Sequence, residues 1–225
     1  MRQEILDTLE KQVDPQHTAL IIVDPQNDFC SNDGAGVNLM GWDVSRMQGA
    51  VQHLNPFIEI ARQEKLMIIW TRSIITDDKA RPNSRARSFV SDARKRGLAF
   101  VEEGSIGADW YIGITGPLAN EHVVTKWHYD AFEDTNLKLV LETGGIKTLL
   151  LTGFTANVCV ETLARHGYIN GYYIVLVSDC TDAPTQHEYE STVFNVKNYF
   201  GKVATSTEIV EIWQATPEPT QVEGG

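Results

Sequence analysis

The stretch Thr148-Leu-Leu-Leu-Thr152-Gly-Phe-Thr-Ala-Asn-Val-Cys159-Val-Glu-Thr162 passes from an apolar run to a helical pattern within a few residues. Residues 148–152 have the continuous apolar character of a buried strand in a parallel sheet. Cys159, Thr162 and Leu163 then recur at helical spacing. The pattern predicts that Cys159 lies where a strand turns into a helix. Taken alone, the stretch favours a buried structural cysteine, and residues elsewhere in the chain change that interpretation.

Strand and helix patterns alternate along the rest of the chain. Apolar runs at 18–23, 66–70, 122–125, 148–152 and 173–177 are typical of buried strands, and residues 203–213 close the domain. This alternation predicts an α/β fold with three layers: a doubly wound, mostly parallel, six-stranded sheet with helices on both faces. Pro56 predicts a kink or break in the helix that precedes the second strand. We expect a single domain over residues 1–225, with an N-terminal extension at 1–16 and a flexible tail at 215–225.

Composition narrows the class of protein. The chain has 225 residues, of which 42% are hydrophobic, so it can form a full-sized core. Its net charge of −11 argues against nucleic-acid binding, which needs a basic face. No apolar run approaches the roughly 20 residues of a membrane span, and the N-terminus lacks a signal-peptide pattern. Three cysteines without a CxxC pair fit a reducing compartment. We therefore expect a cytoplasmic protein whose partner is a small molecule.

Three chemically different side chains follow apolar strands at their carboxyl ends. They are Asp24, Lys126 and Cys159. In an open parallel sheet these ends lie on one edge, where active sites are found. A lysine and a helix N-terminus beside a cysteine both favour the thiolate, so a lowered thiol pKa is expected. Each residue also has a structural interpretation, since Asp24 can cap a helix and Lys126 can lie at the surface.

These segments resemble the isochorismatase-like cysteine hydrolases, a family that includes nicotinamidases, N-carbamoylsarcosine amidohydrolases, biuret hydrolases and ureidoacrylate amidohydrolases. The resemblance rests on residues 19–29, on Lys126 with the aromatic residues behind it, and on residues 152–161, and it extends over about residues 17–213. It implies that Cys159 is a nucleophile, that Asp24 transfers its proton and that Lys126 stabilises the thiolate. It also implies a thioester intermediate and assembly as a homodimer or homotetramer.

The resemblance implies further site residues. A non-proline cis peptide bond is expected between Phe154 and Thr155, with the N–H groups of Thr155 and Cys159 forming an oxyanion hole. The substrate-binding residues that it implies are Phe29, Tyr129, Phe132, Trp70 and Asn157, with Trp127 as a further wall. Each aromatic residue in this set is equally consistent with core packing.

Departures from the family pattern bear on the substrate. Residues 71–79 carry none of the histidines that bind zinc in nicotinamidases, and the six histidines form no ligand-spaced cluster. We therefore expect no metal and no cofactor. Local features resemble ureidoacrylate and biuret hydrolases, which both cleave a carbamoyl C–N bond. The expected activity is hydrolysis of a small amide, ureido or carbamoyl compound. The alternatives are hydrolysis of an isochorismate-like vinyl ether and a non-catalytic binding protein.

The segment 79–96 concentrates basic residues in an otherwise acidic chain. Its composition favours a solvated loop and helix, and the alternative is a lid or a subunit contact.

Overall fold

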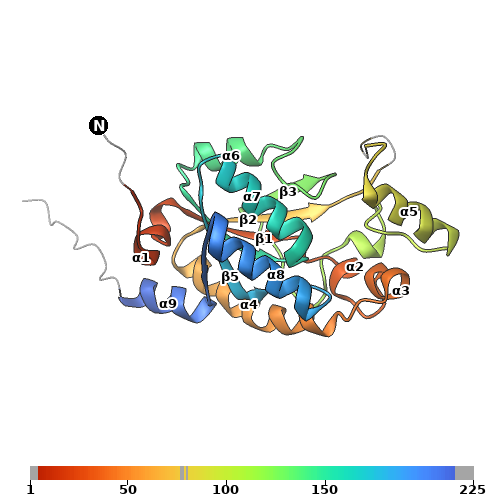
Figure 1. The fold of residues 1–225 in the computed structure, drawn as a ribbon, viewed down its shortest axis with the longest axis horizontal. Coiled ribbons are helices and arrows are strands. Elements are labelled where there is room, and N and C mark those ends of the chain that lie inside the picture. Colours follow the sequence, from red (N-terminus) through yellow and green to blue (C-terminus); the bar gives the residue numbers. More distant parts are fainter. Residues whose placement is uncertain (1–4, 77–78, 80, 216–225) are drawn as a thin grey trace, which may run out of the picture.

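The computed structural model describes residues 5–76, 79 and 81–215, and its centre is one parallel sheet (Figure 1). The strands are β1 (Thr18–Val23), β2 (Met67–Ser73), β3 (His122–Lys126), β4 (Thr148–Gly153), β5 (Tyr173–Thr181) and β6 (Gly201–Ala204). Their spatial order is β3-β2-β1-β4-β5-β6, with every neighbouring pair parallel. The predicted six-stranded, doubly wound α/β fold is confirmed.

Strand β1 shows why the fold has three layers. All six of its residues are buried, as expected for a central strand. Leu20 and Ile22 join one hydrophobic cluster, whereas Ala19, Ile21 and Val23 join another. Successive side chains of a strand point to opposite faces, so the two clusters are two cores, one on each side of the sheet.

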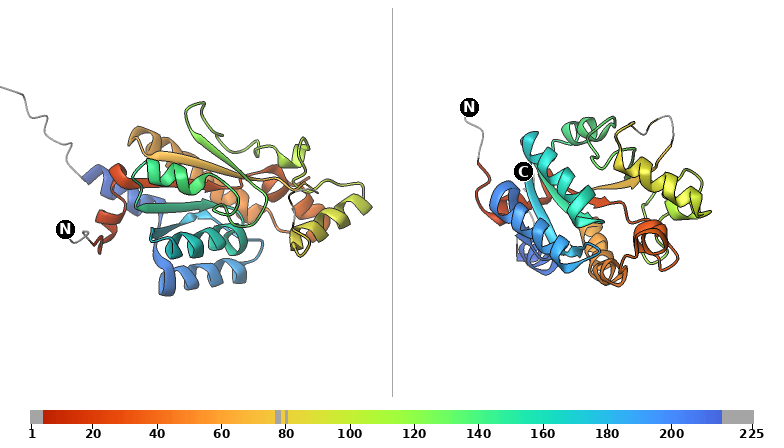
Figure 2. Two further views of the ribbon diagram at one scale, coloured as in Figure 1. Left: turned by 90° about the horizontal axis from the view of Figure 1, so that it is seen from above. Right: turned by 45° about the vertical axis from the view of Figure 1, so that its right-hand side comes forward.

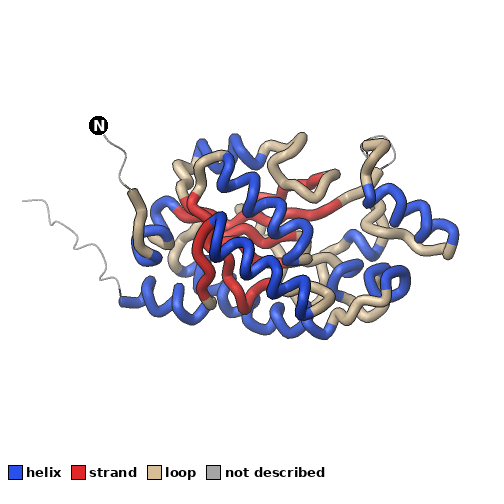
Figure 3. Tube along the Cα trace, viewed as in Figure 1, coloured by secondary structure: helices blue, strands red, loops and turns tan. Residues whose placement is uncertain are grey.

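Each core is covered by its own helices. Helices α4 (Ser45–Gln63) and α9 (Ser206–Ala215) contribute to the cluster that contains Leu20, and α6 (Leu137–Thr143) and α7 (Glu161–Ile169) contribute to the other. Figure 2 shows α8 (Gln186–Asn195) alongside α7, and Figure 3 shows the sheet enclosed by helices.

Of the kink or break predicted at Pro56, the break is wrong, because α4 continues through this residue. Pro56 removes the hydrogen bond that the carbonyl of Gln52 would accept. Both residues lie on the exposed face of α4, where water can solvate that carbonyl. Leu54 and Ile58 on the opposite face are fully buried, and their packing holds the helix together across the proline.

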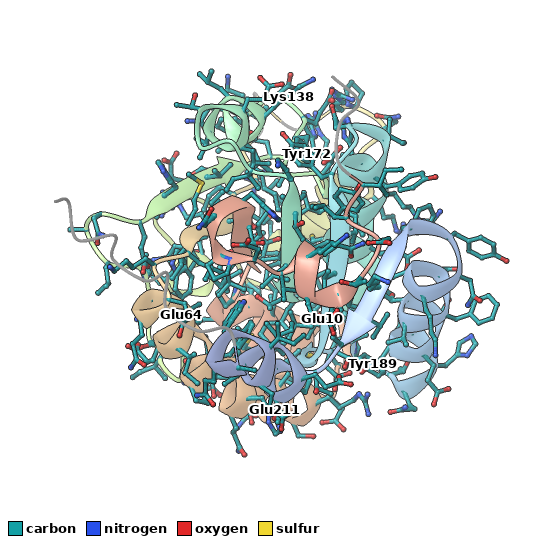
Figure 4. The ribbon with its side chains drawn as sticks, turned by 90° about the vertical axis from the view of Figure 1, so that its left-hand side faces the viewer. Glu10, Glu64, Lys138, Tyr172, Tyr189 and Glu211 are labelled. Carbon is teal, nitrogen blue, oxygen red and sulfur yellow. The ribbon has the colours of Figure 1, made fainter. Side chains whose placement is uncertain are left out.

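The two ends of the sheet differ in what surrounds them. At the carboxyl ends of the strands lie the short helices α2 (Asn27–Cys30) and α3 (Ala35–Met40) and the helix α5 (Arg85–Lys95), on the right of Figure 1. The opposite end carries α1 (Leu9–Gln12) and α9. Figure 4 looks onto this opposite end, where Glu10, Glu64 and Glu211 lie.

The predicted N-terminal extension is attached to the domain. Leu6 is buried and its N–H donates to the hydroxyl of Tyr173 over 3.0 Å. The indole N–H of Trp213 donates to the carbonyl of Val13 over 2.7 Å, which ties the extension to α9. The predicted tail at 215–225 lies outside the described residues from position 216 onward. Within the described residues, no helix combines the length and apolar character that crossing a bilayer requires.

Candidate active site

Asp24 is the first residue beyond β1 and is completely buried. Its N–H donates to the carbonyl of Thr71 over 3.0 Å, and the Thr71 hydroxyl donates to its Oδ1 over 2.7 Å. Its φ is +47°, a left-handed conformation that is uncommon for residues other than glycine. The neighbouring strand β2 thus holds both the backbone and the carboxylate, and Oδ2 is left to face the rest of the site.

Lys126 is the last residue of β3 and its side chain is also completely buried. Its ammonium lies 2.7 Å from Asp24 Oδ2. It also donates to the carbonyl of His128 over 3.0 Å and to the Cys159 sulfur over 3.4 Å. The ammonium therefore makes two hydrogen bonds and one ion pair, all inside the site. Burial, the largest single effect, lowers the pKa of Lys126, but the Asp24 carboxylate and the Cys159 sulfur together outweigh it, so the pKa is raised.

Gly153 allows the segment that carries Cys159 to lie against β1. It ends β4 with a φ of +89°, and a Cβ built there would lie 2.2 Å from the carbonyl oxygen of Val23. The next N–H, that of Phe154, donates to this same oxygen over 2.7 Å. A side chain at position 153 would displace the chain from β1, so the close approach requires glycine.

Cys159 lies in a single π turn, η3 (Ala156–Val160), that precedes α7. The carbonyl of Thr155 accepts from the N–H groups of Val158 and Val160, over 3.2 and 3.3 Å. Among the described residues, the N–H of Cys159 is not one of its donors. The wider turn thus removes Cys159 from the usual helical ladder, and such turns are frequent at functional sites.

The lowered thiol pKa that the sequence suggested is wrong for this site. Burial raises the pKa of Cys159 from 9.0 to about 12, and the Asp24 carboxylate acts in the same direction. Lys126 opposes both effects without reversing them. The reason is charge balance: Asp24 and Lys126 already neutralise each other, so a thiolate would be an additional buried anion. The resting site thus holds a protonated thiol beside an ion pair.

A cavity of about 560 Å³ opens onto this cluster. Its volume falls within the range of small-molecule sites. Of the site residues proposed from the sequence, it is lined by Phe29, Trp127, Tyr129, Thr155 and Cys159. The cysteine therefore lies at the wall of a ligand-sized space, whereas Cys30 and Cys180 are fully buried elsewhere.

Three of the proposed substrate-binding residues do not line this cavity. Trp70 lies fully within the core, where its indole N–H donates to Glu121 over 2.8 Å. The ring of Phe132 packs against His166 and Tyr172 on the α6–α7 side of the sheet. Asn157 points toward α8 and donates to Glu188 over 3.1 Å. The resemblance implied a role for them at the site, but each side chain turns away from it.

The basic segment contributes cavity residues that the sequence interpretation did not favour. Arg81, Asn83, Ser84, Arg85 and Phe89 all line the cavity. The ring of Phe89 lies edge-on to that of Phe100, which in turn lies edge-on to Phe29. The segment is thus a wall of the cavity and more than a solvated surface. Phe89 within a charged helix was the available signal, because an apolar residue there needs a surface to cover.

The proposed oxyanion hole has two structural features. The peptide bond between Phe154 and Thr155 is cis, as the resemblance implied. Thr155 is buried at the cavity wall, and within the described part of the chain its N–H donates to no protein acceptor. Buried N–H groups are seldom left unpaired, so this donor is available to a ligand.

Among the described residues, no group of three or more His, Cys, Asp or Glu side chains is placed to share a metal ion.

Comparison with known proteins places this geometry in context. The isochorismatase domain family matches residues 18–208. The ureidoacrylate amidohydrolase RutB of Enterobacter sp. (strain 638) is 30% identical over 211 residues, covering 88% of this chain and 89% of the relative. A cysteine hydrolase from Pseudomonas syringae pv. phaseolicola 1448A superposes with a TM-score of 0.78 at 22% identity, covering 95% of this chain and 99% of that one. N-carbamoylsarcosine amidase from Thermoplasma acidophilum superposes with a TM-score of 0.66 at 24% identity, covering 84% of this chain and 96% of that one.

Proposed function

The chain belongs to the isochorismatase family, and on this premise we propose that it is a metal-independent cysteine hydrolase. It would cleave a C–N bond of a small amide, ureido or carbamoyl compound through a thioester. The observation that carries the proposal is the buried ion pair of Lys126 and Asp24, 2.7 Å long, with the Cys159 sulfur 3.4 Å from the same ammonium. The names of the relatives, a ureidoacrylate amidohydrolase and an N-carbamoylsarcosine amidase, support the C–N bond as the target.

The first half of the reaction forms the thioester. Because the thiol is protonated at rest, Asp24 accepts its proton as the sulfur bonds to the substrate carbonyl carbon. The carbonyl oxygen becomes an oxyanion, which the N–H groups of Thr155 and Cys159 stabilise. The C–N bond then breaks, and Asp24 returns the proton to the departing nitrogen, which leaves as ammonia or an amine.

The second half regenerates the enzyme. A water molecule loses a proton to Asp24 and attacks the thioester carbon, and the C–S bond breaks. The proton returns to the sulfur, and the product acid releases its remaining proton to solvent to give a carboxylate or, from a ureido compound, a carbamate. Lys126 stays charged throughout, because its raised pKa keeps the proton on the ammonium. Its role is to hold Asp24 and stabilise the charge that passes through the sulfur.

The absence of histidine in residues 71–79 supports a reaction without metal. Chelation is therefore expected to leave turnover unchanged.

Ammonia release from a panel of compounds tests the proposal. The panel contains ureidoacrylate-type ureido acids, biuret, N-carbamoyl amino acids, simple amides and nicotinamide, and Cys159→Ala is the blank. Release from a ureido or carbamoyl compound that is absent in the blank supports the proposal. Equal release by the variant would exclude the thioester mechanism. If no compound of the panel releases ammonia, the result would contradict the proposed C–N bond chemistry.

A further inference from the structure

The oxyanion donor proposed at Thr155 lies between two backbone groups that are held from outside its turn. On one side, the N–H of Phe154 donates to the carbonyl of Val23 over 2.7 Å. On the other side, the N–H of Ala156 donates to the carbonyl of Asp182 over 2.9 Å. The direction of the Thr155 N–H therefore depends on where β1 and Asp182 hold its two neighbours.

These two supports differ in what fixes them. Val23 is the last residue of β1, a central strand whose residues are all buried. Asp182 is the first residue beyond β5 and lies in the irregular segment that leads to α8. The last pairing between β4 and β5 joins Gly153 to Thr181, so Asp182 lies just past it. The ladder of the sheet thus fixes Val23 directly, whereas Asp182 needs a further contact to hold it.

Arg46 supplies this contact from α4. Its Nη2 donates to Asp182 Oδ1 over 2.7 Å, and its Nε donates to the carbonyl of Ala183 over 3.1 Å. Asp182 Oδ1 also accepts from the N–H of Ala183 over 2.8 Å. One guanidinium therefore holds the side chain of one residue and the backbone of the next. The rigid fork of donors in arginine suits such a double contact.

Helix stability does not account for Arg46. It is the second residue of α4, whose first turn contains no acidic residue, and a cation there opposes the helix dipole. Its side chain is 24% exposed and that of Asp182 is 18% exposed, so the pair is largely shielded from water. Neither of these two residues lines the cavity, so Arg46 acts on the site through other residues and not by contact with the substrate.

We propose that Arg46 is a positioning residue of the oxyanion hole. Through Asp182 and Ala156 it keeps the Thr155 N–H directed at the point where the substrate oxygen becomes negative. A donor that is already in place stabilises this charge without reorganisation during the reaction. Loss of the contact therefore slows the chemical step. The inference rests on the proposed function, since it adds a residue to the machinery of the same reaction.

Arg46→Gln tests the inference with the best substrate of the panel. Per folded enzyme, kcat should fall by roughly 10- to 100-fold, the scale of loss when a reacting group is misplaced or an oxyanion donor is weakened. KM should stay within about twofold, because the lost stabilisation belongs to the transition state. Arg46→Lys keeps the charge without the fork and should recover part of kcat. It also replaces Arg46→Gln in the test if that variant does not fold.

Two further variants separate positioning from a general effect on the fold. Arg62→Gln makes the same change on the same helix, where Arg62 pairs with Glu121 over 2.8 Å and is only 13% exposed. It should lower the urea midpoint but leave kcat within about twofold. Combining Arg46→Gln with Asp182→Ala should cost no more kcat than the more damaging single change, because the two side chains act as one unit. The same loss of kcat in Arg62→Gln, or additive losses in the double variant, would overturn the inference.

Hydrogen exchange in the substrate-free enzyme tests the support without turnover. The peptide that contains Ala156 should exchange faster in Arg46→Gln, because its hydrogen bond to Asp182 opens more often, and at the wild-type rate in Arg62→Gln. Unchanged exchange in Arg46→Gln would overturn the inference. If exchange is faster but no panel compound is hydrolysed, the support by Arg46 stands and the proposed function fails. If wild type hydrolyses a panel compound and Arg46→Gln keeps its kcat within about twofold, the proposed function stands and the inference fails.

Discussion

Replacing Lys126 with methionine removes the charge that balances Asp24. Methionine is apolar and nearly as long as lysine, so the change mainly deletes the ammonium. The ammonium nitrogen lies 2.7 Å from Asp24, 3.0 Å from the His128 carbonyl and 3.4 Å from the Cys159 sulfur. Both charged side chains are completely buried. Removing one partner of a buried ion pair costs about 3–5 kcal/mol, because the remaining charge is left uncompensated. A domain has only about 5–15 kcal/mol of stability in total.

Urea denaturation at pH 7 measures the change in the free energy of unfolding, provided that the slope m stays constant. Lys138→Met is the matched control, since Lys138 lies exposed on α6, at the end of the molecule shown in Figure 4. Its pair with Glu142 is 3.9 Å long and solvent-exposed, so the control should cost no more than about 0.5 kcal/mol.

A second variant identifies the cause of the loss. Adding Asp24→Asn to Lys126→Met removes the uncompensated charge while the Thr71 hydroxyl keeps an acceptor at position 24. The double variant should therefore be more stable than Lys126→Met alone, by about 2 kcal/mol or more. The reasoning is refuted if Lys126→Met costs no more than the Lys138 control, or if the double variant is the less stable of the two.

The protonation states and the backbone lead to further predictions. Because burial raises the pKa of Cys159 to about 12, its alkylation by iodoacetamide should still rise about tenfold per pH unit between pH 7 and 9, and a plateau near pH 7 would contradict this; Cys30 and Cys180 should stay unmodified while the protein is folded. The raised pKa of Lys126 means that its ion pair is fully formed below its usual pKa of 10.5 and is lost as the pH rises through the folded-state value. As the pH is raised from 7, the difference in unfolding free energy between wild type and Lys126→Met should therefore stay constant up to pH 10.5 and narrow only above it. A difference that narrows near neutrality would count against the ion pair of Lys126 and Asp24. Gly153→Ala should lower the urea midpoint by an amount equal to at least about 2 kcal/mol, given its positive φ and the contact with Val23; an unchanged midpoint would show that the strand can move aside.

The sequence was sufficient to predict which catalytic side chains meet, because one rule of parallel sheets fixes where they lie. Asp24, Lys126 and Cys159 each follow an apolar strand, and the carboxyl ends of parallel strands meet at one edge. The structure brings the three side chains together at that edge. A second rule predicted the sheet with its two covered faces, because a strand buried on both sides, such as β1, needs helices on both sides.

Side-chain direction was beyond the sequence. Phe29 and Phe132 are both aromatic residues beyond a strand end, yet Phe29 lines the cavity and Phe132 packs among buried residues beside His166. The difference depends on the local backbone, which composition does not reveal. The charge state of Cys159 was likewise unpredictable, since a nearby lysine and burial act in opposite directions. The structure shows that burial of Cys159 prevails, because Asp24 beside it offsets part of the effect of Lys126.

Peptide mass spectrometry of acid-quenched turnover tests the central claim most directly. The enzyme is mixed with the best substrate of the panel, quenched within a turnover and digested, and the peptide that contains Cys159 is analysed. The account predicts an adduct equal in mass to the acyl or carbamoyl group on Cys159, absent from Cys30 and Cys180 and lost as turnover ends. Full turnover by Cys159→Ala, or an adduct on another residue, would contradict it.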